Sequence, residues 1–220
     1  MLIINPQPSP KAIVLWLHGL GADQNDFVDF INLLNLKQFT FILPNAPYRK
    51  ITLNQGVEMR GWYDIESLNF EKQDEVGLKK SMIFIESILE KQHKISDKNK
   101  LFIGGFSQGA ALAQYIGLTS KFNFTKIVSL SGYCPDIQLS DKKSNLEIQA
   151  IHGVDDNVIN INLAKASYEK LKIIKNFVLK EYKMGHEVIN EEILDVRDFL
   201  LRDKGDDYRK YTSRQTYCRT

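Results

Sequence analysis

The stretch Gly105-Phe106-Ser107-Gln108-Gly109 decides how this sequence folds. The apolar run at 101–104 before it is typical of a short buried strand, and the run at 110–115 after it favours a helix. A strand, a G-x-S-x-G pentapeptide and a helix in this order predict a strained turn that presents a serine as a nucleophile. Both glycines are needed because strand and helix nearly touch there. The alternative is an ordinary glycine-rich turn with an exposed serine, and the rest of the chain must decide between them.

Length and composition narrow the class of protein. The 220 residues suffice for one large domain, and 43% hydrophobic with 25% charged residues is typical of a soluble globular protein. A net charge of +2 argues against nucleic acid or an anionic membrane as the main partner. No apolar run approaches the roughly 20 residues of a transmembrane segment, and the N-terminus lacks the pattern of a signal peptide. The two cysteines are far apart, so we expect a reducing cytoplasm as the setting.

Apolar runs alternate with amphipathic segments along the chain. Strands are predicted at 12–17, 39–43, 101–104, 127–130, 148–151 and 177–182. Helices are predicted from a cap at Asp23 or Asn25, from Glu75 to about Lys91, and at 110–115, 161–174 and about 187–202. This alternation predicts an α/β fold with a mostly parallel sheet and helices on both faces, built as a single domain over 1–204. Residues 205–220 contain no aliphatic side chain, so we expect a polar, disordered tail there.

A serine hydroxyl is a weak nucleophile and needs a positioned base, usually a histidine. The chain has four histidines: His18, His93, His152 and His186. His93 lies at the polar end of a helix, while His18 and His152 each end an apolar strand. A core role is expected for His152. His186 follows the last strand and precedes the last helix, where the Ser…Asp…His order of the α/β-hydrolase fold places the base.

The imidazole in turn needs an aspartate that orients it and stabilises its charged form. This residue should follow a strand that lies between the serine and the histidine. Asp155 and Asp156 come just after the strand at 148–151, whereas Asp136 and Asp141 do not directly follow an apolar strand. Turn formation alone would account for one aspartate here, and the spacing does not separate Asp155 from Asp156.

The oxyanion that forms at an acyl carbon needs two preorganised N–H donors. Gln108, at the start of the helix, supplies one. The glycine loop at 18–21 is placed to supply the other, with Leu20 as first choice and Gly21 as second. The same loop does not fit a dinucleotide fingerprint, because Gln24 stands where the third glycine belongs. No histidine pair or carboxylate spacing indicates a metal site.

With these residues in place, the chain resembles the phospholipase/carboxylesterase family that includes the acyl-protein thioesterases. The resemblance covers about 11–202 and rests on the motifs Leu17-His18-Gly19-Leu20-Gly21, Arg60-Gly61-Trp62-Tyr63-Asp64, Gly105-Phe106-Ser107-Gln108-Gly109, His152-Gly153-x-x-Asp156 and Gly185-His186. It implies that Asp156, four residues after His152, is the acid. It also implies Leu20 and Gln108 as the oxyanion donors and Trp62 as part of the wall near the acyl site. Members hydrolyse carboxylic esters and thioesters of acyl chains without a cofactor, so none is expected here.

Two departures from the family pattern concern the pocket. Val158-Ile159 stands where a Val-Pro pair is usual, and Ala110 replaces a glycine that often follows Ser-Gln-Gly. The sequence therefore does not decide whether the substrate is a small ester, a lipid or an acylated protein. It also leaves the oligomeric state open, and a homodimer is one of the states considered. The competing class is a catalytically silent hydrolase fold that binds a ligand or a partner. The presence of all three triad residue types argues against that class.

The segment 48–73 is expected to be irregular, and so long an excursion is more often a functional loop than a simple connector. It carries Trp62, Tyr63, Leu68 and Phe70. One interpretation places these side chains in a satellite core beneath the loop. The other places them along a shallow groove that binds the acyl chain beside Ser107.

Overall fold

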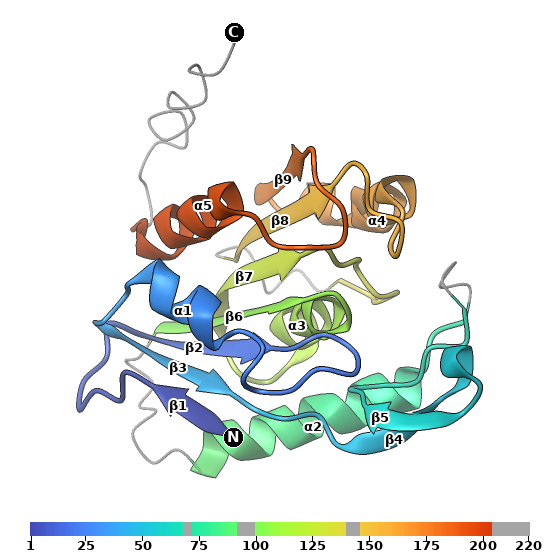
Figure 1. The fold of residues 1–220 in the computed structure, drawn as a ribbon. Coiled ribbons are helices and arrows are strands. Elements are labelled where there is room, and N and C mark those ends of the chain that lie inside the picture. The colour runs from blue at the N-terminus through green and yellow to red at the C-terminus, as the bar shows by residue number, and fades with distance from the viewer. Residues whose placement is uncertain (68–71, 92–99, 140–145, 204–220) are drawn as a thin grey trace, which may run out of the picture.

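The computed structural model describes residues 1–67, 72–91, 100–139 and 146–203. Within these ranges seven strands form one sheet in the order β1-β3-β2-β6-β7-β8-β9 (Figure 1). Their bounds are β1 Leu2–Ile4, β2 Ala12–Leu17, β3 Phe39–Leu43, β6 Lys100–Phe106, β7 Phe124–Leu130, β8 Glu147–Gly153 and β9 Asn176–Tyr182. Within this sheet, as far as the structure describes it, only the pairing of β1 with β3 is antiparallel. The predicted tail, 205–220, lies outside the described residues.

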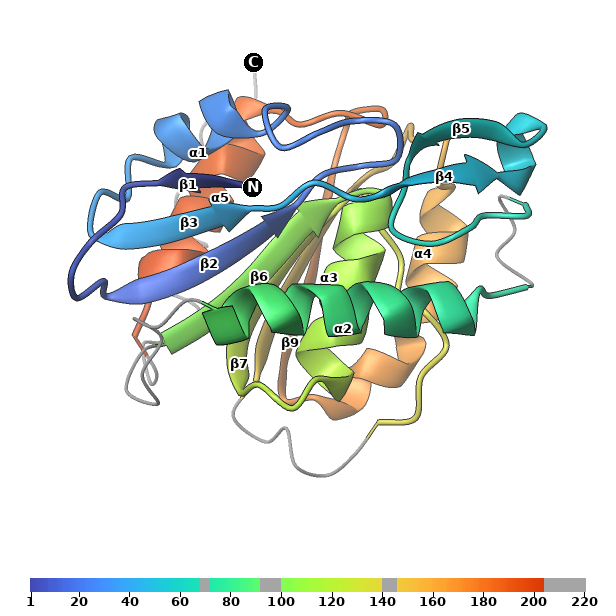
Figure 2. The ribbon, with the colours of Figure 1, turned by 90° about the horizontal axis from the view of Figure 1, so that it is seen from below.

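Helices cover both faces of the sheet (Figure 2). One layer contains α1 (Val28–Leu34) and α5 (Asn190–Leu201), and the other contains α2 (Glu75–Lys91), α3 (Gln108–Thr119) and α4 (Ile161–Tyr168), which a 3₁₀ turn, Glu169–Ile173, continues. Two separate clusters of buried apolar side chains correspond to these two layers. The predicted fold class, a mostly parallel sheet with helices on both faces, is confirmed. None of the described helices has the length and apolar content needed to cross a membrane.

The central strands are continuous apolar runs because helices cover them on both sides. Every residue of β2 and every residue of β8 is buried. Since β2, β6, β7, β8 and β9 all run parallel, their carboxyl ends meet at one edge of the sheet. The loops that follow β2, β6, β8 and β9 therefore gather at that edge, where ligands bind in open α/β sheets.

The segment 48–73 is more regular than predicted. It contains an antiparallel hairpin of β4 (Tyr48–Ile51) and β5 (Val57–Arg60), with a 3₁₀ turn at Thr52–Asn54. Each strand has only four residues with mixed polar and apolar side chains, which leaves too short a pattern to distinguish from a loop. Part of this segment, 68–71, lies outside the described residues.

The first helix begins later than predicted. Asp23 does not cap it. One of the Asp23 carboxylate oxygens instead accepts a hydrogen bond from the Asn25 backbone N–H at 2.7 Å, which forms a local turn. The helix begins at Val28, and no side chain caps it.

A buried carboxyl at the start of α5 should make stability depend on pH. The Glu192 side chain is fully buried and accepts a hydrogen bond from the Ile189 N–H at 3.1 Å. Burial raises the pKa of Glu192 to about 8 from 4.5, and the nearby Asp195 and Glu187 carboxylates add to the rise. The folded protein then keeps a proton that the unfolded chain releases, so the free energy of unfolding should fall as pH rises through this window.

We predict that Glu192→Gln removes much of this fall, because an amide does not titrate. The measurement is the melting temperature between pH 5 and pH 8, with the exposed neighbour Glu191→Gln as the matched control. The wild type and the control should lose stability together over this range, and Glu192→Gln should lose less. Parallel curves for all three proteins would contradict the prediction.

Candidate active site

Ser107 occupies a strained turn between β6 and α3. Its backbone angles are φ 54° and ψ −122°, a region that non-glycine residues rarely adopt. The Ser107 N–H donates to the Leu130 carbonyl at 2.9 Å, and its own carbonyl accepts from the Ala111 N–H at 3.1 Å. A β-carbon on residue 109 would overlap the carbonyl oxygen of Leu17, so only glycine lets α3 lie this close to β2. The turn thus presents the serine hydroxyl at the carboxyl edge of the sheet.

Three side chains form a hydrogen-bonded series at this edge. The Ser107 hydroxyl donates to Nε2 of His186 at 3.0 Å, and the imidazole Nδ1–H donates to Oδ2 of Asp156 at 2.7 Å. The other carboxylate oxygen of Asp156 accepts the N–H groups of Val158 and Ile159, both at 2.8 Å. Three hydrogen bonds thereby fix the carboxylate, which in turn fixes the imidazole against the hydroxyl.

The two aspartates that the spacing could not separate lie in different places. Asp156 is buried, with 3% of its surface exposed, and it faces His186. Asp155 is exposed, and its backbone N–H donates to the Met184 carbonyl at 3.1 Å. Asp136 instead pairs with Lys170 at 3.2 Å, and Asp141 lies outside the described residues.

A close approach of two loops brings the imidazole to the carboxylate. A β-carbon on Gly153 would overlap the carbonyl oxygens of Met184 and Gly185, so the loop after β8 packs directly on the loop after β9. The Val154 N–H donates to the Tyr182 carbonyl at 2.9 Å and continues the pairing of these strands past their ends. The sequence therefore needs a glycine immediately after His152 for the site to close.

Two further histidines are buried beside the site. His152 Nε2 lies 2.7 Å from the Ile159 carbonyl, to which it donates, and 3.3 Å from the carboxylate of Asp156. His18 accepts a hydrogen bond at Nε2 from the Ala46 N–H at 3.0 Å. Burial lowers the pKa of both imidazoles, which favours their neutral forms. His152 is the buried core histidine that its place at a strand end predicted, and His93 lies outside the described residues.

The expected oxyanion donors lie close to Ser107. Leu20 and Gln108 both line the cavity described below, as does Gly19. The alternative donor, the Gly21 N–H, is already bonded to the Arg60 carbonyl at 2.8 Å. This favours the Leu20 N–H as the donor from this loop.

A cavity of about 400 Å³ opens beside the hydroxyl and the imidazole. Its lining is mostly apolar and comprises Gly19, Leu20, Ala22, Asp26, Leu53, Asn54, Ile65, Phe106, Ser107, Gln108, Tyr133, Val158, Ile159 and His186. Among these, Val158 and Ile159 are the pair that departs from the family pattern. Leu53, Ile65 and Tyr133 were not identified from the sequence, because nothing in their spacing distinguishes them from other apolar residues.

The aromatic residues expected along an acyl groove do not lie on the wall of this cavity. Trp62 and Tyr63 are 0% and 2% exposed, belong to the buried cluster beneath α2 and α3, and are absent from the lining. This pair is therefore part of the main buried cluster and not of a separate satellite core beneath the loop. The same segment still reaches the cavity, through Leu53 and Ile65. Leu68 and Phe70 lie outside the described residues.

Side chains of the metal-binding types form no ligand set in the ranges that the structure describes. No three histidine, cysteine, aspartate or glutamate side chains gather there closely enough to hold an ion.

Comparison with known proteins gives consistent matches. The family model described as phospholipase/carboxylesterase matches residues 1–202. Acyl-protein thioesterase 1 of Saccharomyces cerevisiae is 33% identical over 215 residues, which covers 89% of this chain and 94% of that protein. Acyl-protein thioesterase 1 homolog 2 of Dictyostelium discoideum is 28% identical over 213 residues, covering 91% and 96%. The crystal structure of Zea mays acyl-protein thioesterase 2 matches with a TM-score of 0.82 at 28% identity, covering 90% and 96%.

The geometry predicts different effects for the two adjacent aspartates. Asp156→Asn should lower kcat for a p-nitrophenyl ester on the order of 10⁴-fold, because the amide no longer holds the imidazole in the required tautomer. Asp155→Asn, the matched control at an exposed position, should change kcat little. Steady-state kinetics of both variants make the test, and a reversed ranking would show that the acid is misassigned by one residue.

Proposed function

The chain belongs to the phospholipase/carboxylesterase family, and from that membership we propose that it hydrolyses acyl esters and thioesters through a covalent acyl-enzyme on Ser107. One observation carries the assignment of residues. The hydroxyl of Ser107, the imidazole of His186 and the carboxylate of Asp156 are hydrogen-bonded in series beside a mostly apolar cavity. A nucleophile, a base and an orienting acid in this order are the parts that acyl transfer needs.

Acylation begins when the Ser107 oxygen attacks the carbonyl carbon of the substrate. His186 takes the hydroxyl proton at Nε2, and Asp156 stabilises the imidazolium that forms. The carbonyl oxygen becomes an oxyanion that the N–H groups of Leu20 and Gln108 stabilise. The tetrahedral intermediate then collapses, the bond to the leaving oxygen or sulfur breaks, and His186 returns the proton to the leaving group.

Deacylation repeats the same steps with water as the nucleophile. His186 removes a proton from a water molecule, and the resulting hydroxide attacks the acyl carbon. Collapse of the second tetrahedral intermediate releases the carboxylic acid and returns the proton to Ser107. The same two N–H donors stabilise both intermediates, so no other group needs to move.

The cavity supports an acyl chain as the part of the substrate that is recognised. Its volume is about 400 Å³, and Leu53, Ile65 and Val158 contribute apolar side chains to its wall. The relatives from Saccharomyces cerevisiae and Dictyostelium discoideum are acyl-protein thioesterases, so an acylated protein is the substrate class that we favour over a lipid or a small ester. We place this activity in a reducing cytoplasm, in keeping with Cys134 as a free, buried thiol.

Ser107→Ala should abolish turnover of p-nitrophenyl butyrate and leave the melting temperature close to that of the wild type. The matched control is Ser131→Ala, because Ser131 is also buried and also has a positive φ, of 46°, but does not line the cavity. Initial rates on purified proteins measure the effect. Retention of more than about a hundredth of the wild-type rate in Ser107→Ala would refute the assignment, since nucleophile and base act as a unit.

The apolar cavity predicts a dependence on acyl-chain length. Each methylene that becomes buried contributes at most roughly 0.8 kcal/mol, or about fourfold in kcat/KM. The kcat/KM of p-nitrophenyl esters should therefore rise from acetyl through butyryl and hexanoyl to octanoyl, until the cavity is filled.

A substitution in the wall should remove this trend. Leu53→Trp should flatten the series and leave acetyl ester hydrolysis mostly intact, while Leu194→Trp, at an exposed position on α5, should keep the wild-type slope. Rates that fall steadily beyond acetyl in the wild type would point instead to an enzyme for small esters.

A further inference from the structure

The segment Arg60–Tyr63 is bonded to the loop that carries the first oxyanion donor. The Gly21 N–H donates to the Arg60 carbonyl at 2.8 Å. On the other side of Leu20, the indole Nε1–H of Trp62 donates to the His18 carbonyl at 2.8 Å. These two hydrogen bonds fasten the loop on both sides of Leu20, and neither of them uses the Leu20 N–H.

The same segment is bonded to the residue that carries the second donor. The Gln108 side chain is 1% exposed, and its amide oxygen accepts the Trp62 N–H at 2.9 Å. Its amide nitrogen donates to the Tyr63 carbonyl at 2.7 Å. The side-chain amide therefore satisfies two backbone groups of the segment, while its own backbone N–H is the one assigned to the oxyanion.

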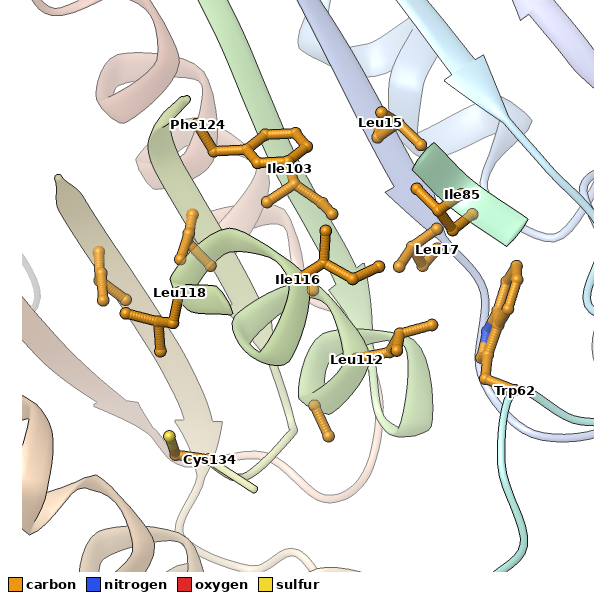
Figure 3. Packing of buried hydrophobic residues seen from close by; sticks show 14 of the residues in the cluster. Leu15, Leu17, Trp62, Ile85, Ile103, Leu112, Ile116, Leu118, Phe124 and Cys134 are labelled. Carbon is orange, nitrogen blue, oxygen red and sulfur yellow. The ribbon is translucent and has the colours of Figure 1, made fainter. Parts of the chain in front are cut away.

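The segment is itself anchored to the body of the protein. The Ser81 hydroxyl of α2 donates to the Trp62 carbonyl, and the Arg60 guanidinium donates to the Ala46 carbonyl at 2.8 Å. Figure 3 shows Trp62 within the buried cluster that also contains Leu17 of β2 and Leu112 of α3. A buried segment with hydrogen bonds to α2 and to Ala46 thus lies between the two loops.

We propose that the side chains of Trp62 and Gln108 are positioning groups, which hold the Leu20 and Gln108 N–H donors at the separation that an oxyanion on Ser107 requires. The inference rests on the proposed function, since it needs acyl transfer at this serine. The two donors follow different strands, β2 and β6, and the Arg60–Tyr63 segment connects them. A donor stabilises the transition state only when it points at the developing charge, and a displacement of about 1 Å can cost on the order of 10²-fold in rate.

The chain offers a matched pair of tryptophans for the test. Trp16 and Trp62 are both buried, but the indole nitrogen of Trp16 has no hydrogen-bond partner among the described residues. Trp62→Phe removes the bond to the His18 carbonyl, whereas Trp16→Phe makes the same change in volume without losing such a bond. The comparison separates positioning of the loop from loss of packing.

The kinetic signature of lost positioning is specific. Trp62→Phe should lower kcat and kcat/KM for p-nitrophenyl butyrate together, by about tenfold to a hundredfold, with KM little changed. Inhibition by an alkyl trifluoromethyl ketone, whose serine adduct places an oxyanion in the same position, should weaken by the same factor as kcat/KM falls. Trp16→Phe should keep wild-type kinetics at a comparable loss of melting temperature. Each rate is divided by the concentration of active sites, which titration with a fluorophosphonate determines.

A second variant keeps the test decisive if Trp62→Phe does not fold. Gln108→Met keeps the backbone N–H and the length of the side chain but removes both amide bonds to the segment, and it should show the same joint fall in kcat and inhibitor affinity. Wild-type kcat in the folded variants, or a rise in KM alone, would overturn the inference while the proposed function stands. Absence of ester turnover in the wild type would instead refute the proposed function, and this inference with it.

Discussion

The close contact between the start of α3 and the end of β2 is the constraint on which the site depends. Gly109 has no β-carbon to meet the Leu17 carbonyl, so the helix begins directly against the neighbouring strand. This contact and the hydrogen bond from Ser107 to Leu130 hold the serine at a positive φ that it would otherwise avoid. The same contact brings the loop after β2 beside the serine, so the nucleophile and the loop with the Leu20 N–H are positioned together. Pocket, oxyanion donors and base are then arranged around one fixed hydroxyl.

A second requirement is a buried carboxylate whose hydrogen bonds are all provided. Asp156 receives two backbone N–H groups on one oxygen and the imidazole of His186 on the other, and the His152 ring packs 3.3 Å away. Such a charge is tolerable in the interior only because these donors replace water. The turn that follows β8 supplies the two backbone N–H donors that replace water at the carboxylate. Gly153 lets that turn lie against the loop of His186. Local backbone geometry therefore fixes the position of the Asp156 carboxylate relative to the His186 imidazole.

The sequence predicted those features that follow from local pattern. Continuous apolar strands such as β2, and a glycine-flanked serine between a strand and a helix, have few alternative explanations. Asp155 and Asp156 were not separable by spacing, because burial of one and exposure of the other depends on how the turn packs against the next loop. The hairpin of β4 and β5 was missed since its strands are short and of mixed polarity. The aromatic character of Trp62 and Tyr63 suggests an acyl groove, yet in the structure the Trp62 indole N–H and backbone groups of both residues make hydrogen bonds to the loops of the site. No composition pattern indicates such hydrogen bonds.

Chemical labelling is the sharpest test of whether Ser107 forms the covalent acyl-enzyme. The wild-type protein is treated with an alkyl fluorophosphonate, digested and mapped by mass spectrometry, with and without competing p-nitrophenyl octanoate. We expect one modified peptide, carrying the phosphonyl group on Ser107, and slower labelling when the ester is present. Labelling of a different residue, or an unlabelled Ser107 in a protein that still hydrolyses the ester, would contradict it.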